Sequence, residues 1–138
     1  MIKFLLASHG NLADGMYSSV KIIMGEQSNI STLCAYVEEN FDLKKEVSKI
    51  INGLSCEDKL IVITDVFGGS VNNEFMTNLK NKNIYLISGL NLPLVIELIT
   101  NQDNEDIDSL INRALESSKD SICYCNKVIN SVQADEEF

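Results

Sequence analysis

A single histidine limits the chemistry that this 138-residue chain can perform through an imidazole. His9 follows the apolar run 2–7, which places it at the end of a predicted buried strand. Proton or phosphoryl chemistry that uses an imidazole near neutral pH must therefore use His9. Mechanisms that need two imidazoles in one chain, and zinc sites of the histidine-rich kinds, are excluded. By position alone, a lone histidine at a strand end is more often a surface or capping residue.

Asp65 occupies the matching position after a second apolar run, 59–64. An aspartate that ends a strand is commonly a cap or turn residue. Beside an imidazole, however, a carboxylate bonded to one ring nitrogen fixes the tautomer and stabilises the ring as it becomes cationic. The other ring nitrogen, by this reasoning Nε2, is then free to act as a nucleophile. His9 and Asp65 are therefore predicted as the catalytic residues of a phosphoryl-transfer site.

Two glycines and a serine, Gly68, Gly69 and Ser70, come shortly after Asp65 and precede a predicted helix. Paired glycines let backbone N–H groups approach an anion closely, and the start of a helix adds partial positive charge. Gly-Gly-Ser is also a frequent turn, so the motif alone is weak evidence. Taken together with His9, it predicts a phosphate-binding cradle.

Continuous apolar runs alternate with helical patterns, and these elements must position the candidate residues. Such runs are typical of strands buried on both faces, as in parallel sheets. Strands are predicted over residues 2–7, 31–36, 59–64 and 83–88. Three helices are predicted to begin at a capping residue: Asp14 to about Met24, Asp42 to about Asn52 and Ser70 to about Leu79. Two more are predicted over residues 94–99 and 106–118. The alternation predicts an α/β fold with a doubly wound, mostly parallel sheet of four parallel strands and helices on both faces.

The order of the strands decides whether His9 and Asp65 meet. In doubly wound sheets, ligands bind outside the carboxyl ends of the strands, at the point where the strand order reverses. The common order 2-1-3-4 places the first and third strands side by side. The loops that carry His9 and Asp65 are then expected to flank the binding crevice.

The last part of the chain contains one more predicted strand. Residues 121–129 have a strand pattern but no room for a parallel crossover, so we expect a C-terminal antiparallel strand at the sheet edge. A terminal edge strand often pairs with another chain. Residues 1–130 are expected to form a single domain, and residues 131–138 an acidic, frayed tail.

Composition narrows the classes of partner. The chain has 11 Lys and Arg against 20 Asp and Glu, a net charge of −9, which argues against nucleic acid and favours a basic protein partner.

The chain has no candidate transmembrane segment and is expected in the cytoplasm. It has no P-loop and no dinucleotide-binding fingerprint, and neither a cofactor nor a metal is expected. Free thiols are expected at Cys34, Cys56, Cys123 and Cys125, with a metal site at the last two as the weaker alternative.

Four short motifs follow one another along nearly the whole chain. They are Ala-Ser-His-Gly at 7–10, Met-Gly-Glu at 24–26, Thr-Asp-Val-Phe-Gly-Gly-Ser at 64–70 and Gly-Leu-Asn-Leu-Pro at 89–93. Each motif is weak alone. In their order and spacing they resemble the IIA component of the mannose family of the bacterial phosphoenolpyruvate-dependent sugar phosphotransferase system.

The resemblance implies a phosphoryl carrier. At the matching positions, His9 would accept the phosphoryl group from the phosphocarrier protein HPr and pass it to a IIB protein for sugar uptake and phosphorylation, and Asp65 would support the ring. The resemblance also implies a homodimer formed by exchange of a C-terminal strand, and a place beside the membrane components of the sugar permease. Where the family often has Thr, Trp and Pro, this chain has Val66, Phe67 and Val71. The family's roles for these side chains are therefore not carried over.

Two other functions remain open. The first is a phosphotransfer subunit that serves dihydroxyacetone kinase, which shares the fold and a Ser-His after the first strand, although the stretch 68–70 favours the sugar system. The second is a regulatory binding module of flavodoxin-like shape, in which His9 is a docking or signalling group. The resemblance leaves the transported sugar open, since selection lies mainly in the membrane components.

Overall fold

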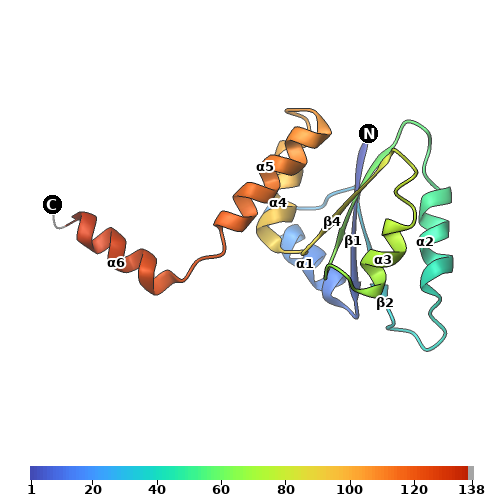
Figure 1. Ribbon diagram of the computed structural model, residues 1–138, viewed down its shortest axis with the longest axis horizontal. Helices are drawn as coiled ribbons and strands as arrows, with labels where there is room; N and C mark the ends of the chain where they lie inside the picture. The colour runs from blue at the N-terminus through green and yellow to red at the C-terminus, as the bar shows by residue number, and fades with distance from the viewer. Residues whose placement is uncertain (137–138) are drawn as a thin grey trace.

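The computed structural model describes the backbone of residues 1–136 and the side chains of residues 1–130. Within these residues, four strands form one all-parallel sheet in the order β2-β1-β3-β4 (Figure 1). The predicted number, direction and order of the parallel strands are confirmed. Their bounds are Ile2–His9 for β1, Ile30–Ala35 for β2, Lys59–Thr64 for β3 and Ile84–Ser88 for β4.

Helices cover both faces of the sheet, as predicted. One face packs against α1 (Leu12–Met24), α4 (Leu92–Asn101) and α5 (Ile107–Asp120), and the other against α2 (Leu43–Asn52) and α3 (Ser70–Met76) (Figure 1). Each face buries a hydrophobic cluster of its own. The fold is therefore a doubly wound α/β sheet.

The strands are continuously apolar because both of their faces are buried. In β1, Phe4 and Leu6 belong to the cluster with α1, α4 and α5, whereas Leu5 and Ala7 belong to the cluster with α2 and α3. All four side chains are at most 1% exposed. Since successive side chains of a strand point to opposite faces, a strand in this position needs an apolar residue at every step.

Helix α1 begins differently from the prediction. It starts at Leu12, and the Ser8 hydroxyl at the end of β1 accepts the Ala13 N–H at 2.8 Å. Asp14 is not the cap; it lies in the first turn and accepts a hydrogen bond from the Thr32 hydroxyl at 2.6 Å. The residue that precedes His9 thus ties the end of β1 to the start of α1.

Helix α3 also differs at both ends. Its N-cap is Gly69 rather than Ser70, which is instead the first helical residue, with its hydroxyl directed to His9. The helix ends at Met76, three residues before the predicted Leu79. Ser70 is therefore available for the candidate site because it does not cap its own helix.

The C-terminal segment does not form the predicted strand. Residues 122–124 have no regular structure, and α6 (Cys125–Glu136) projects away from the body of the protein (Figure 1). The antiparallel strand expected over 121–129 is thus not formed in the single chain, where α6 satisfies its backbone groups internally. Ile122 and Tyr124 are exposed beside the body.

The expected acidic tail, 131–138, stays a prediction: its backbone belongs to α6 up to Glu136, and residues 137 and 138 lie outside the described residues. No helix in the described part of the chain combines the length and the apolar character needed to cross a membrane.

Candidate functional site

The structure brings His9 and Asp65 together at the carboxyl edge of the sheet. His9 is the last residue of β1, and Asp65 directly follows the neighbouring strand β3. The imidazole Nδ1 lies 2.8 Å from Asp65 Oδ2. The His9 side chain is 42% exposed and the Asp65 side chain 9%, so the ring is accessible while its carboxylate partner is largely covered.

Asp65 is held as a carboxylate. Burial by itself raises the pKa of Asp65, but hydrogen bonds from the His9 N–H and ring, the charge of that ring and the Val66 N–H outweigh burial and hold the pKa below its usual value. A carboxylate only accepts hydrogen bonds. Nδ1 of His9 therefore carries a proton, and in the neutral ring Nε2 has a free lone pair.

Ser70 approaches the opposite side of the imidazole. Its Oγ lies 3.2 Å from Nε2. The start of α3 is anchored below it by a buried hydrogen bond in which the Thr64 hydroxyl donates to Asn72 Oδ1 at 2.7 Å. This bond links the end of β3 to α3, and so it fixes Ser70 relative to His9.

The two glycines have different roles in the geometry. Gly68 has φ = +81°, a left-handed conformation that favours glycine. A Cβ at Gly69 would lie 3.2 Å from His9 Cε1, so the ring and the backbone need the space that glycine leaves. The Gly69 N–H is already bonded to the Val66 carbonyl at 3.2 Å, whereas those of Gly68 and Ser70 have no partner among the described residues.

Tyr36 is a site residue that the sequence reasoning missed. Its hydroxyl lies 2.8 Å from Ser70 Oγ, and its ring lies 5.5 Å from the His9 ring, centroid to centroid. In the sequence, Tyr36 reads as the last residue of a strand, and no motif marks it. Its position depends on the turn after β2, which no local pattern predicts.

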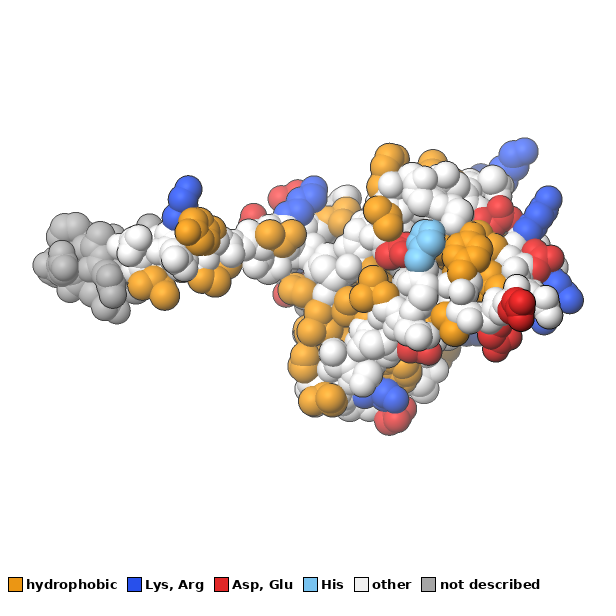
Figure 2. Space-filling view, turned by 90° about the horizontal axis from the view of Figure 1, so that it is seen from below, with side chains coloured by type: hydrophobic (Ala, Val, Ile, Leu, Met, Phe, Trp, Pro, Cys, Tyr) orange, Lys and Arg blue, Asp and Glu red, His pale blue; other side chains and the backbone are white. Residues whose placement is uncertain are grey.

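The site opens on a surface that is partly hydrophobic. The His9 side chain is visible in Figure 2 with acidic and hydrophobic side chains beside it. Tyr36, Val37, Val66 and Phe67 are each at least half exposed, Phe67 at 76%. The chain's single arginine is in α5, and the site segments 9–12, 36–42 and 65–70 contain no lysine, so these loops supply no cationic side chain of their own.

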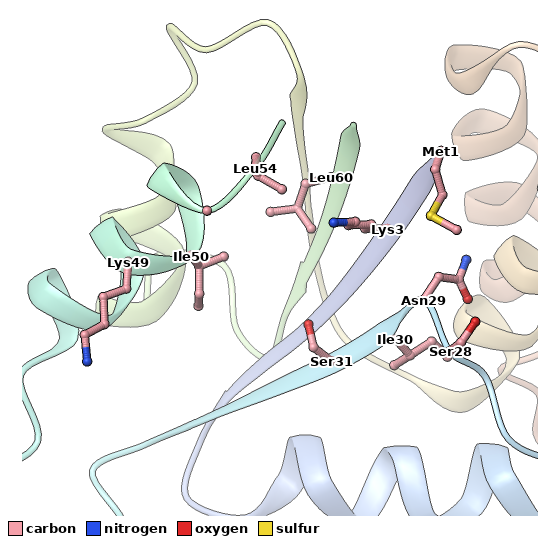
Figure 3. Close-up of a pocket in the computed structure, with 11 residues that line it drawn as sticks. Met1, Lys3, Ser28, Asn29, Ile30, Ser31, Lys49, Ile50, Leu54 and Leu60 are labelled. Atoms are coloured by element: carbon pink, nitrogen blue, oxygen red, sulfur yellow. The ribbon is translucent and has the colours of Figure 1, made fainter. Parts of the chain in front are cut away.

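A hollow lies at the end of the sheet opposite to His9 and Asp65, where the strands begin. It has a volume of about 370 Å³ and lies between the starts of the strands and the end of α2 (Figure 3). Two of its polar lining residues are already engaged: Lys3 pairs with Asp58 at 2.9 Å, and Asn29 donates to the Ile2 carbonyl and to Gln102. We therefore place the candidate site at His9.

Cysteines and metal ligands do not cluster at the site. Cys34, half-buried near Asp14, has a thiol pKa raised mainly by burial, while Cys123 and Cys125 are exposed and unpaired. Among the side chains of residues 1–130, no group of three or more His, Cys, Asp and Glu residues is arranged to hold a metal ion.

Comparison with known proteins identifies the family. A family model described as "PTS system fructose IIA component" (EIIA-man) matches residues 3–115, which is most of the chain. This chain belongs to the mannose-type EIIA family of the sugar phosphotransferase system. The family resemblance predicted from the four motifs is confirmed, and this EIIA chain is a phosphoryl-transfer component.

Individual relatives agree with this assignment. The EIIA chain is 31% identical to the sorbose-specific EIIA component of Klebsiella pneumoniae, over 80% of this chain and 82% of the relative. It is 21% identical to the fructose-specific EIIA component of Bacillus subtilis, over 96% of this chain and 92% of the relative. A crystal structure from Klebsiella pneumoniae, described as a permease of the phosphoenolpyruvate-dependent sugar phosphotransferase system, superimposes with a TM-score of 0.90 at 47% identity over 93% of both chains.

Proposed function

We propose that His9 is the phosphoryl acceptor of this EIIA chain, taking the group from phospho-HPr and passing it to a IIB protein. The observation that carries the proposal is the fixed tautomer: the bond to Asp65 places the proton on Nδ1 and leaves the lone pair on Nε2. Because the side chain of His9 is accessible and that of Asp65 is covered, a protein partner reaches the nucleophilic nitrogen directly.

The transfer is an in-line displacement between two imidazoles. The Nε2 lone pair of His9 forms a bond to phosphorus as the N–P bond in phospho-HPr breaks, and the electrons of that bond return to the ring of HPr. Nδ1 keeps its proton. The ring of His9 becomes cationic, and the carboxylate of Asp65 stabilises it through the bond at 2.8 Å. Transfer to the IIB protein runs the same steps in reverse on His9.

The glycine-rich turn supplies donors for the phosphoryl oxygens. We assign this role to the Ser70 hydroxyl and to the N–H groups of Gly68 and Ser70. Gly69 contributes by the space that it leaves beside the ring rather than by its N–H, which is already bonded. All three residues of the predicted cradle thus have a part, but not the same one.

The partners should dock through a basic surface with an apolar centre. The chain has a net charge of −9, and a hollow of about 560 Å³ near the site includes Asp14, Glu38, Asp42 and Glu46 among its lining residues. The exposed hydrophobic side chains beside His9 supply the apolar part of the contact. Association with HPr should therefore weaken as salt rises.

The sugar system is favoured over dihydroxyacetone kinase. The relatives named above are sorbose- and fructose-specific EIIA components, and an EIIAB component from Escherichia coli K12 that is mannose-specific is 24% identical over 88% of this chain. We therefore place this chain beside the membrane components of a sugar permease, with a IIB protein as the acceptor of its phosphoryl group.

A homodimer formed through the C-terminal segment is part of the proposal. Ile122, Tyr124, Val128 and Ile129 are exposed on the segment that leaves the body. A strand over 121–129 requires the start of α6 to unwind and pair with the sheet edge of a second copy. Analytical ultracentrifugation of the full chain and of a chain ending at residue 121 tests this: a monomer in both cases contradicts the dimer.

Phosphorylation by purified components tests the function of His9. With phosphoenolpyruvate, enzyme I and HPr, we expect acid-labile, alkali-stable phosphate on the wild-type chain and none on His9→Ala. Because the chain has one histidine, a phosphohistidine in it can only be His9. Phosphate on His9→Ala contradicts the mechanism. A phosphorylated chain that transfers to no IIB protein and binds another protein tightly indicates the regulatory module instead.

A further inference from the structure

Tyr36 is held in a backbone conformation that is rare for its residue type. Its φ is +65°, in the left-handed region, where a Cβ is unfavourable. Every other left-handed residue in the described part of the chain is a glycine. Such a conformation persists only where its surroundings hold it, and it is found often at functional sites.

The environment of the Tyr36 ring does not resemble that of a core residue. Tyr36 is 51% exposed, so burial does not explain why a side chain is kept at this strained position. Its ring lies between two others, with the centroid 5.5 Å from that of His9 and 5.4 Å, edge-on, from that of Phe41. These contacts direct the hydroxyl toward Ser70, 2.8 Å away.

The carboxylate of Asp65 sets the direction of a chain of hydrogen bonds that ends at Tyr36. Asp65 accepts from Nδ1 of His9, so Nε2 of the neutral ring has a lone pair and accepts from the Ser70 hydroxyl. With its proton used in this way, Ser70 Oγ accepts from the Tyr36 hydroxyl. Hydrogen bonds in such a series strengthen one another.

We propose that Tyr36 is a positioning residue for phosphoryl transfer, a role that rests on the proposed function of His9. Its hydroxyl holds Ser70 Oγ beside Nε2 and makes the Ser70 hydroxyl a stronger donor. When Nε2 forms the bond to phosphorus, the Ser70 hydroxyl turns from Nε2 to a phosphoryl oxygen. Tyr36 keeps the serine oxygen in place during this exchange, and no further proton leaves the site.

Tyr36→Phe removes the hydroxyl and keeps the ring. We expect single-turnover transfer from phospho-HPr to slow about fivefold, the factor that one net hydrogen bond contributes. The matched control is Tyr17→Phe, which removes a hydroxyl that donates to the Gln27 carbonyl at 3.0 Å. This control should transfer at the wild-type rate.

A double-mutant cycle with Ser70→Ala separates positioning from a general structural effect. If Tyr36 acts through Ser70, Tyr36→Phe has no further effect on the rate once Ser70 is alanine. Independent effects that multiply overturn the proposal. The nitrogen NMR signal of His9 Nε2, free of overlap because the chain has one histidine, should also move in Tyr36→Phe toward that of a free ring nitrogen.

The outcomes distinguish this inference from the proposed function. If the wild-type chain takes no phosphate on His9, the proposed function fails, and the role of Tyr36 in transfer fails with it. If the wild-type chain transfers and Tyr36→Phe matches it in rate, only the inference is wrong.

Discussion

Asp65 accepts two hydrogen bonds from His9 at one oxygen. The backbone N–H and the ring Nδ1 of His9 both lie 2.8 Å from Asp65 Oδ2. The backbone bond fixes where the carboxylate sits relative to β1, and the ring bond then fixes the orientation of the imidazole. Asp65, which directly follows the neighbouring strand β3, therefore orients the imidazole of His9 before a partner protein binds.

The charge of Asp65 should matter more to transfer than to folding. Asp65→Asn keeps the shape and an accepting oxygen but loses the charge that stabilises the ring as it becomes cationic. A hydrogen bond to a charged group contributes about 1.5–3 kcal/mol, so we expect transfer from phospho-HPr to slow roughly 10- to 100-fold. Rapid-quench measurement of phosphorylated chain gives the rate, and circular dichroism checks the fold. Unchanged kinetics would remove Asp65 from the mechanism.

Acid should destabilise the wild-type chain more than Asp65→Asn. The pKa of Asp65 is lowered in the folded protein. The stability it contributes is complete above the unfolded pKa of about 3.9 and is lost as the pH falls through the lower folded pKa. Urea unfolding from neutral pH to below this range should show the difference between the two proteins shrinking in acid. A constant difference contradicts the prediction.

The space at Gly69 should be needed for transfer. In Gly69→Ala, the added methyl group would lie 3.2 Å from His9 Cε1, so the ring must shift and its bonds to Asp65 and Ser70 lengthen. We expect roughly 10-fold slower transfer, because small displacements of reacting groups are costly. Gly15→Ala is the matched control, since its added methyl group meets no atom within 4 Å. An equal loss in both variants contradicts this explanation.

The buried bond between Thr64 and Asn72 should stabilise the protein. Thr64→Val leaves Asn72 Oδ1 buried without its donor, which costs about 1–3 kcal/mol. Thr77→Val is the control: its exposed hydroxyl donates to the Glu74 carbonyl, which water can reach, and the expected change is within about 0.5 kcal/mol. Urea unfolding of both variants measures their free energies of unfolding. A Thr64→Val variant as stable as the wild type contradicts a stabilising role for the bond between Thr64 and Asn72.

The sheet could be predicted from the sequence because its signals are local. Strands buried on both faces need an apolar residue at every step, and these runs predict the ends of all four strands to within two residues, the largest difference being at the end of β1. The common order of such sheets predicts the strand order 2-1-3-4, and the structure confirms it. With that order, His9 and Asp65 had to lie side by side.

The caps and the C-terminal segment were harder to predict. Asp42 caps α2 as its local sequence indicates. Asp14 and Ser70 have equally good cap chemistry, but the N-cap positions fall on Asn11 and Gly69. At the start of α1, the Ser8 hydroxyl from the end of β1 accepts the Ala13 N–H instead. The pattern of residues 121–129 suits a strand, yet a strand needs a sheet edge beside it, and the single chain forms α6 instead.

The sequence by itself determined the one possible imidazole, the carboxylate that follows the third strand and the glycine-rich turn, because these depend on residue type and on local pattern. The tertiary structure decided what surrounds them. The bond between Tyr36 and Ser70 joins residues 34 positions apart, and that between Ser70 and His9 joins residues 61 apart. Such contacts depend on the paths of two turns and on a strained φ at Tyr36, which come from packing of the whole sheet rather than from any segment of the chain.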